Sequence, residues 1–464
     1  MPVPQLRRRA AALAAAALAS CGLVACGGGA SSNGDLHTIT VWNLDGQPDR
    51  MAAVKKINQR FTTRTGIKVQ EVAVLETQLP SLVASGAVSG TLPDLISGLP
   101  LALVRQLHQQ KLLDSATATK IVDGLGRSTF ASKALALTKQ GNQQLAVPSD
   151  AWVQLIGYRK DLFAKAGLAP PTTYTAIEKA ARVLTTGNQT GITLATDPGD
   201  PFTQQSFESL ALGNDCQLVD SGGGVKLDSP ACVRTFELYG ALARSYSPQG
   251  TQSVDTTRAA YFAGQSAMII WSTFLLDELA GLRSDALPTC PQCKNDPAYL
   301  AKNTGLVTAV QGPDGGGPRG YGEIASWAFL VDHKAAASSY VRYMMSDGYR
   351  DALAVAPEGK YPVRNGDAAN PTKFVDEWPS LPAGVDKKRP LNKVYDARTL
   401  KQVAHAIGTL QRWAIPQGQG DLLGPTVAEL AIPKVVSSLA NGESPQATAG
   451  DAQTAVTDIQ RSLK

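Results

Sequence analysis

Residues 36–74 read LHTITVWNLDGQPDRMAAVKKINQRFTTRTGIKVQEVAV, and this stretch carries the signals of a strand, a helix and a second strand in succession. Residues 36–42 are rich in β-branched and apolar side chains, which predicts the first strand. The helix is indicated by apolar residues at helical spacing, namely Met51, Val54, Ile57 and Phe61. Gly66 ends this helix, and a further helix near 79–87 and an apolar strand at 92–96 follow. Strands that alternate with helices predict a parallel sheet with crossover helices, so the chain begins with an α/β lobe.

A second region begins at an extended segment, QLAVPSDAWVQLIGY at residues 144–158. Pro148 interrupts this segment, and because proline lacks the N–H donor of a strand ladder, it suits a crossing between two lobes. Another extended piece lies at 266–271, and beyond Pro362 the pattern is mainly helical. At 464 residues the chain is also too long for one ordinary core. We therefore expect two lobes.

The N-terminus has the pattern of a secretory signal. Arg7, Arg8 and Arg9 precede an apolar run at 10–20 that is too short to span a bilayer comfortably. We expect residues 1–25 to be removed on export. No later run in the sequence is long and apolar enough for a transmembrane helix.

The end of this signal resembles the bacterial lipobox, in which an aliphatic residue and two small ones precede a lipid-modified cysteine. Two candidates exist, LASC ending at Cys21 and LVAC ending at Cys26. Lipidation of Cys26 leaves four further cysteines, an even number that suits an oxidising compartment, whereas use of Cys21 leaves Cys26 unpaired beside it. We therefore predict lipidation at Cys26 and a flexible tether at 26–35, which is rich in glycine and serine. The mature protein is then expected on the extracytoplasmic face of the cell membrane.

The charge distribution argues against a nucleic-acid partner. The formal net charge is +5, but three of the positive charges lie in the segment that we expect to be removed. No basic block stands out in the remaining sequence, so the electrostatic footprint of a nucleic-acid-binding protein is missing.

Several segments, in this order, resemble the sugar-type extracellular solute-binding proteins of ABC importers, the maltose-binding-protein-like family. The matching segments are NQRF at 58–61 with GIKV at 66–69, LPDLI at 92–96, YRKDLF at 158–163 with AGLAPPT at 166–172, FAGQSAM at 262–268 and LANGESP at 439–445. The sequence departs from the family pattern at Arg159, where asparagine is usual, and at Tyr174, where tryptophan is common. The CPQC insert at 290–293 is not a general feature of the family.

The resemblance implies an α/β, two-lobe periplasmic-binding-protein-like fold, with hinge strands and a ligand cleft between the lobes. The N-terminal lobe would comprise 36–147 with about 320–357, and the C-terminal lobe 148–319 with about 358–464. The implied function is capture of a small polar solute, above all a sugar or oligosaccharide, by lobe closure. The implied partners are the transmembrane subunits of an ABC permease. The resemblance implies a monomer with neither cofactor nor chemistry.

A sugar site needs aromatic platforms for the ring faces and polar side chains for the hydroxyls, because buried polar groups without partners are costly. Asn43 and Asp45 follow the first strand and are candidates; the alternative is a local turn toward Gly46. Asp150 and Trp152 follow the crossing proline, and the alternative for the tryptophan is packing between the lobes.

Further candidates come from later segments. Trp271 and Ser272 lie at the end of an apolar strand, where the sequence changes from apolar to polar residues. Tyr321 and Glu323 resemble the hinge return of the family, the alternative for Glu323 being a solvated loop acid. Trp413, in the segment QRWA at 411–414, is the last candidate, as a residue that would face the cleft from the second lobe.

The four cysteines of the mature chain favour two structural disulfides, Cys216–Cys232 and Cys290–Cys293, although two other connectivities remain open. The spacing of Cys290 and Cys293 also occurs in redox and zinc motifs. No histidine falls in a metal-binding pair, and the segment has loop composition, so a metal site is not predicted.

Two other functions remain open at this point. A secreted carbohydrate-active hydrolase on a similar scaffold is one, although no G-x-S-x-G elbow, P-loop or H-E-x-x-H helix occurs. A sensor lipoprotein that presents its ligand to a receptor is the other. Within the binding function, a sugar phosphate or a polyamine is an alternative ligand to a neutral sugar.

Overall fold

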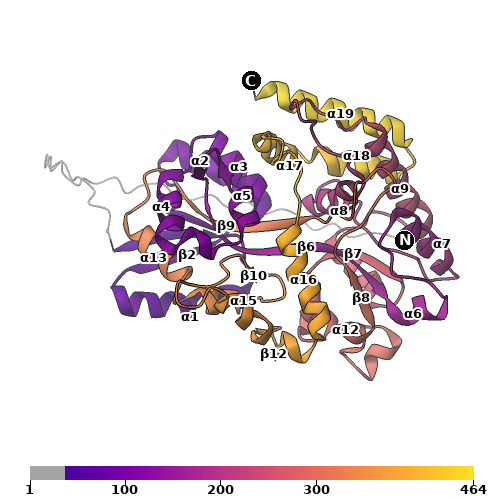
Figure 1. Cartoon of the computed structure of the whole chain (residues 1–464), viewed down its shortest axis with the longest axis horizontal. Helices are drawn as coiled ribbons and strands as arrows, with labels where there is room; N and C mark the ends of the chain where they lie inside the picture. Colours follow the sequence, from indigo (N-terminus) through magenta and orange to yellow (C-terminus); the bar gives the residue numbers. More distant parts are fainter. Residues whose placement is uncertain (1–36, 464) are drawn as a thin grey trace, which may run out of the picture. The chain divides into compact units, whose positions relative to one another are not determined.

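The computed structural model describes residues 37–463. Within that range an eight-stranded sheet has the order β10-β6-β9-β3-β1-β2, with β7 and β8 also paired to β6. Helices surround these strands, so the architecture is mixed α/β as the sequence predicts (Figure 1). The predicted lipidation site Cys26, the signal segment and the tether lie outside the described residues.

The first strands and helices form the predicted parallel unit. β1 (Thr38–Asn43), β2 (Lys68–Ala73) and β3 (Leu95–Leu99) pair in parallel, with β1 in the middle. α1 (Pro48–Thr65) and α2 (Leu79–Ser89) connect them. α1 starts at a proline and ends at Gly66, which adopts the left-handed conformation with φ 74°. The carboxyl ends of β1 and β3 therefore lie at the same sheet edge.

β6 (Val147–Arg159) is the longest strand and belongs to two groups of elements. Its first half pairs with β9 (Gly322–Phe329) and β10 (Tyr361–Pro362), and its second half pairs with β7 (Met268–Ser272) and β8 (Thr304–Val307). Figure 1 shows β6 running from the elements around β2 and β9 to those around β7 and β8. The strand thus makes the crossing that the sequence predicts.

Pro148 does not interrupt this strand, which corrects the expectation of a break. Its pairing with β9 shifts register between Pro148 and Asp150. Pro148 remains paired with Ser326 and Ser149 is the residue left out of the ladder, so the proline lies beside a β-bulge, where strands tolerate it.

Two disulfides lie among the second group of elements. Cys216 pairs with Cys232 and Cys290 with Cys293, at Cα–Cα distances of 4.5 Å and 4.9 Å. This is the connectivity favoured by the sequence. All four cysteines are buried, so the bridges form part of the core.

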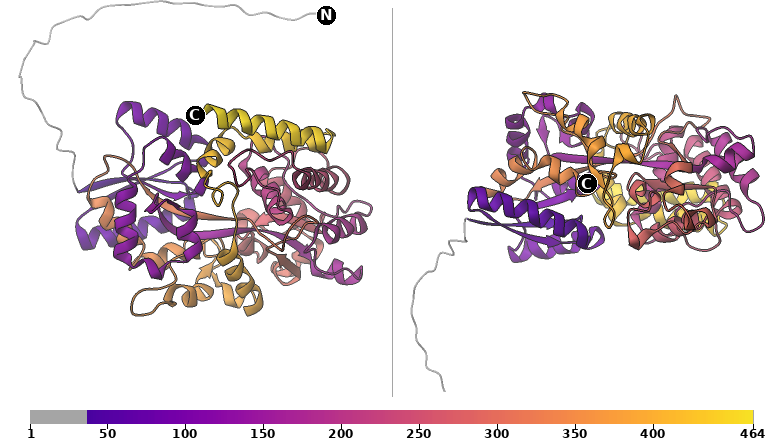
Figure 2. Two further views of the ribbon diagram at one scale, coloured as in Figure 1. Left: turned by 45° about the horizontal axis from the view of Figure 1, so that its top comes forward. Right: turned by 90° about the horizontal axis from the view of Figure 1, so that it is seen from below.

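The remaining helices cover the strands and complete the C-terminal part. They are α3 (Leu101–Gln109), α4 (Ser115–Leu125), α5 (Ser132–Leu137), α6 (Lys160–Lys165), α7 (Tyr174–Leu184), α8 (Pro201–Ala211), α9 (Pro230–Tyr246), α10 (Val254–Phe262), α11 (Leu275–Leu279), α12 (Tyr299–Asn303), α13 (Ala336–Met344), α14 (Tyr349–Leu353), α15 (Lys373–Glu377), α16 (Ala397–Thr409), α17 (Leu423–Ala428), α18 (Ala431–Ala440) and α19 (Pro445–Ser462). Short two-stranded sheets are made by β4 (Lys139–Gln140) with β5 (Gln143–Gln144), and by β11 (Pro382–Ala383) with β12 (Arg389–Pro390). α18 and α19, yellow in Figure 2, pack against α9.

Among residues 37–463, no single helix is both long and apolar enough to cross a bilayer. The bent pair Gly420–Ala428 and Ala431–Ala440, at 57°, reaches the required length and composition only when its two helices are taken together.

Candidate functional site

A cavity of about 570 Å³ lies where several strands end. Its wall includes Asp45 just after β1, Gly98 within β3 and Ser272 at the end of β7. The first half of β6 contributes Asp150 and Trp152. In open α/β sheets, ligands bind beyond the carboxyl ends of strands, so this cavity is the candidate binding site.

Six of the nine predicted ligand-binding residues line this cavity, namely Asp45, Asp150, Trp152, Trp271, Ser272 and Glu323. They come from four separate strands or strand ends, and the sheet brings them together. These residues line the cavity, and their contact with a ligand stays a prediction.

The other three predicted residues do not line the cavity. Asn43 is buried, and its side-chain amide donates to Glu71 at 2.6 Å. Tyr321 lies behind the wall, with its ring 5.9 Å from that of Trp152. Trp413 is fully buried, and its indole N–H donates to the carbonyl of Cys216 at 2.8 Å, so it serves the core.

Asp45, in the cavity wall, forms ion pairs with two buried cations. Lys360 Nζ lies 2.5 Å from Asp45 Oδ2 and 3.5 Å from Asp150 Oδ1, while Arg50 Nη1 lies 3.0 Å from Asp45 Oδ1. Burial alone would raise the pKa of Asp45, but the neighbouring cations outweigh it and lower this pKa to about 2. Asp45 is therefore ionised and held in place without a ligand.

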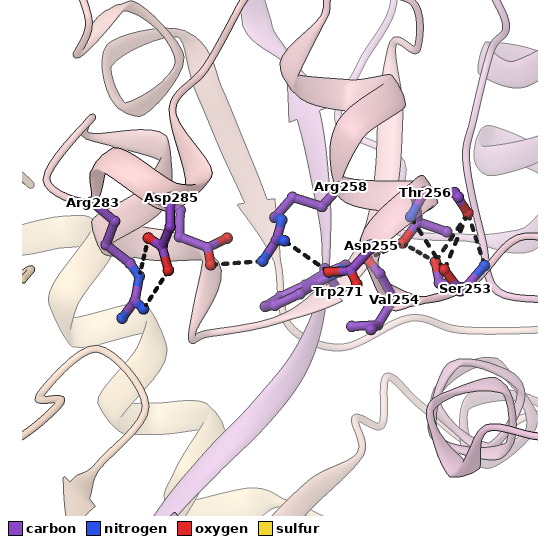
Figure 3. A network of polar contacts seen from close by, with 10 residues as sticks. Ser253, Val254, Asp255, Thr256, Arg258, Trp271, Arg283 and Asp285 are labelled. Atoms are coloured by element: carbon purple, nitrogen blue, oxygen red, sulfur yellow. Dashed lines mark hydrogen bonds and ion pairs between the residues drawn. The ribbon is translucent and has the colours of Figure 1, made fainter. Parts of the chain in front are cut away.

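A second polar network joins side chains of α10, α11 and the segment after α11 (Figure 3). Arg258 on α10 bridges Asp255 at 2.8 Å and Glu278 at 3.0 Å. Arg283 pairs with Asp285 at 3.0 Å. Burial raises the pKa of Glu278 to about 7, against the opposing effect of Arg258.

Four aromatic side chains line the cavity beside these charges, namely Trp152, Phe202, Trp271 and Phe274. The rings of Phe202 and Trp271 are 5.8 Å apart, and those of Trp152 and Phe274 are 6.3 Å apart. The Trp271 indole N–H donates to the carbonyl of Val254 at 3.2 Å, which fixes the ring (Figure 3). Such fixed rings are suitable platforms for the apolar face of a sugar.

Glu323 connects the cavity to a buried ion-pair triad. Its carboxylate accepts hydrogen bonds from Arg412 and, at 2.8 Å, from the backbone N–H of Leu101. Arg412 also pairs with Glu208 at 3.2 Å. Glu323 is thus a structured carboxylate, not the solvated loop acid that was the alternative.

Sequence reasoning missed several residues of the wall. Phe274, Asp277 and Glu278 follow the predicted Trp271–Ser272 step within a few positions, so that segment already contained a usable signal. The remaining missed charged and aromatic residues of the wall are Arg50, Glu76, Asp200, Phe202, Arg258, Arg283, Asp285 and Lys360. Lys360 immediately precedes β10, and only the pairing of β10 with β6 brings it to Asp150.

Metal binding has no support in the part of the chain that the structure describes. No group of three or more histidine, cysteine, aspartate or glutamate side chains there has an arrangement that would hold a metal ion.

Comparisons with known proteins agree with this architecture. A curated relative from Escherichia coli (strain K12), the putative ABC transporter periplasmic-binding protein YcjN, is 27% identical over 327 residues, covering 68% of this chain and 71% of the relative.

Two solved structures share the fold. The GacH receptor of Streptomyces glaucescens, solved unliganded and with acarbose, has a TM-score of 0.69 at 19% identity, covering 92% of this chain and 99% of that one. The sugar transporter of Arthrobacter chlorophenolicus with bound laminaribiose has a TM-score of 0.70 at 15% identity, covering 91% and 99%. These two-lobe neighbours establish the fold class.

The sequence profile of one family covers most of the chain. The family described as bacterial extracellular solute-binding protein matches residues 45–351, a range that includes β2, β3, the crossing strand β6 and most of the cavity wall. The chain therefore belongs to the family of bacterial extracellular solute-binding proteins.

Proposed function

We propose that this chain is the substrate-binding lipoprotein of an ABC importer, and that it captures a sugar or oligosaccharide by closure of two lobes. The observation that carries the proposal is the cavity of about 570 Å³, which is lined by aromatic rings together with charged and hydroxyl side chains. Its volume lies within the range of small-molecule sites, about 300–1,000 Å³. The E. coli relative named as a periplasmic-binding protein of an ABC transporter supports the transport role.

The sugar class rests on the composition of the wall and on solved proteins with this fold. Those with acarbose and laminaribiose carry carbohydrate ligands. In our chain, Trp152 and Trp271 would stack on ring faces, while Asp45, Asp150 and Ser272 would pair with hydroxyls. Each buried hydroxyl of a sugar needs a partner of this kind.

Lobe closure is proposed from the position of the cavity. Residues 36–147 with about 320–357 would form one lobe, and 148–319 with about 358–464 the other. β6 and β9 would then act as hinge strands, because β6 pairs with strands of both groups. A closed, liganded form would dock as a monomer on the two halves of the permease, and the chain itself would carry out no chemistry.

The lipid anchor is proposed from the LVAC sequence that ends at Cys26. Replacement Cys26→Ala should release the full chain from membranes of the producing cells into the soluble fraction. Retention in the membrane fraction would refute Cys26 as the anchor and point to Cys21.

Ligand-induced thermal stabilisation tests the binding function. A screen of sugars, polyols, sugar phosphates, amino acids and polyamines should give a rise in melting temperature for one sugar or polyol class, because a ligand that binds only the folded state stabilises it by mass action. The recovered sugar should be chemically unchanged. A rise with a different class alone, or turnover of a glycoside, would contradict the proposed function.

A further inference from the structure

The cavity wall contains more acidic than basic side chains. Its carboxylates are Asp45, Glu76, Asp150, Asp200, Asp277, Glu278, Asp285 and Glu323, whereas its cations are Arg50, Arg258, Arg283 and Lys360. The eight negative charges exceed the four positive ones, so the fully ionised wall carries a formal charge of −4. Burial raises the pKa of Glu76 and of Glu278 to about 7, so part of this charge is protonated near neutral pH, and a neutral solute would leave the ionised part without a counter-charge.

The four cations are already engaged by carboxylates. Arg50 contacts Asp45, Lys360 contacts Asp45 and Asp150, Arg258 contacts Asp255 and Glu278, and Arg283 contacts Asp285 and Asp49. Glu323 is paired with Arg412 behind the wall. The positive charge of each of these cations is already balanced by a carboxylate of the protein. This balance argues against a solute that carries a phosphate group.

Three carboxylates of the wall remain without an ion-pair partner among residues 37–463, namely Glu76, Asp200 and Asp277. They come from different parts of the chain: Glu76 precedes α2, Asp200 caps α8, and Asp277 lies on α11. The Asp200 carboxylate accepts from the backbone N–H of Phe202 at 2.9 Å, a helix-cap contact that supplies no full charge.

Asp277 is buried with incomplete hydrogen bonding. The residue lines the cavity and is only 2% exposed, yet Oδ2 accepts no hydrogen bond in the described structure. Its polar support is the backbone N–H of Glu278, with Arg283 and Arg50 acting only through longer-range attraction. Burial raises the pKa of Asp277 to about 6. An ionised carboxylate this deeply buried is costly in free energy unless a cation or a hydrogen-bond donor contacts its free oxygen.

A simple metal ion does not fit this arrangement. No group of three acidic, histidine or cysteine side chains in the described residues lies close enough to hold one. The acids are spread along the cavity, beside the rings of Phe202 and Trp271. Aromatic faces attract organic ammonium groups, so rings and carboxylates together favour an extended organic cation.

We propose that the solute is a polyhydroxylated amine, a sugar or polyol with at least one protonated amino group, held by Glu76, Asp200 and Asp277 of the cavity. The inference rests on the proposed sugar-binding function and narrows its substrate class. Hydroxyls of the solute would meet the free donor at Arg50 Nε and the free acceptor at Glu278 Oε2, both of which lie in the wall without hydrogen-bond partners. The ammonium group would compensate the excess negative charge.

Calorimetry on the detergent-solubilised full chain tests this with two matched pairs near pH 7. The pairs are D-glucitol with 1-amino-1-deoxy-D-glucitol, and cellobiose with the β-1,4-linked glucosamine dimer. We expect the aminated member of at least one pair to bind at least tenfold tighter, with a preference that shrinks in 0.5 M NaCl because salt screens charge.

Variants assign the preference to these residues. Glu76→Gln, which removes a carboxylate of the cavity wall, should lower the ratio of amine affinity to neutral affinity about tenfold. Asp277→Asn should do the same, whereas Asp123→Asn, on the surface outside the cavity, should leave both affinities and their ratio unchanged.

The outcomes separate the two proposals. Equal or tighter binding of the neutral members would overturn the amine inference and leave the sugar-binding function standing. An amine preference that survives in both cavity variants would also overturn it. Absence of binding by all four compounds would overturn the amine inference, whereas the sugar-binding function is decided separately by the thermal screen.

Discussion

Arg412 lies at the centre of a buried ion-pair triad, and its replacement is the sharpest test of how the cavity is held. Its side chain is 2% exposed, that of Glu208 is 0% exposed and that of Glu323 is 5% exposed. Arg412 also covers the ring of Tyr321 at 4.7 Å. The triad joins α8 to β9 and to the segment after α16.

The perturbation is Arg412→Met, which keeps much of the side-chain volume and removes the charge. Two buried carboxylates would then lose their common partner. Burial already raises the pKa of Glu208, and Arg412 is the main opposing influence. Removing one partner of a buried ion pair costs about 3–5 kcal/mol, because the remaining charge stays buried and uncompensated. We expect the free energy of unfolding to fall by that amount.

The assay is urea denaturation followed by tryptophan fluorescence, with two comparison variants. Arg461→Met removes an ion pair with Asp458 whose side chains are 73% and 63% exposed, and it should cost less than about 1 kcal/mol. Adding Glu208→Gln to Arg412→Met should recover part of the loss, since it removes one of the uncompensated charges. A loss below about 1 kcal/mol for Arg412→Met, or no recovery in the double variant, would refute the reasoning.

Three further predictions concern the aromatic wall, the titratable groups and a disulfide. Trp271→Ala removes a fixed stacking ring, so it should weaken the affinity for the sugar or polyol found in the thermal screen by about 10- to 100-fold, beyond any effect of lost stability. Unchanged affinity in a folded variant, measured by calorimetry, would exclude Trp271 from the site. Burial raises the pKa of Asp277 to about 6 and that of Glu278 to about 7, so the folded protein binds these protons more tightly than the unfolded chain. The stability linked to them is complete below their unfolded values of 3.8 and 4.5 and is lost as pH rises through 6 to 7. The ligand-free protein should therefore become less stable to urea between pH 5 and pH 8, by about 4 kcal/mol. The double variant Asp277→Asn/Glu278→Gln should reduce this dependence, and a flat or opposite slope in the unaltered chain would contradict it. Replacing Cys216 and Cys232 by alanine removes a disulfide that spans a sequence separation of 16, and it should lower the free energy of unfolding by about 3 kcal/mol. Loss of the Cys290–Cys293 disulfide, which spans a separation of 3, should cost less. Equal losses in denaturation would argue that the stabilisation by these disulfides does not come from the entropy of the unfolded loop.

Local patterns in the sequence were sufficient for the fold class. The spacing of Val54, Ile57 and Phe61 predicted α1, which buries those residues, and Gly66 marked its end. Helix and strand periods depend on backbone geometry that each segment carries by itself, so they are readable without neighbours. The residues that follow strand ends, such as Asp45 and Ser272, were predictable for the same reason.

The composition of the cavity was decided by tertiary structure. Lys360 reaches Asp45 across 315 positions of sequence, and no local signal marks such a pair. Trp413 has the same side chain as Trp271, but packing directs one indole into the core and the other into the cavity wall. The sequence by itself determined the strands, the helices and the family resemblance, since these follow from short-range periodicity and ordered motifs. Which carboxylates meet a cation and which, like Asp277, remain without one depends on distances between remote segments, and only the folded chain sets those distances.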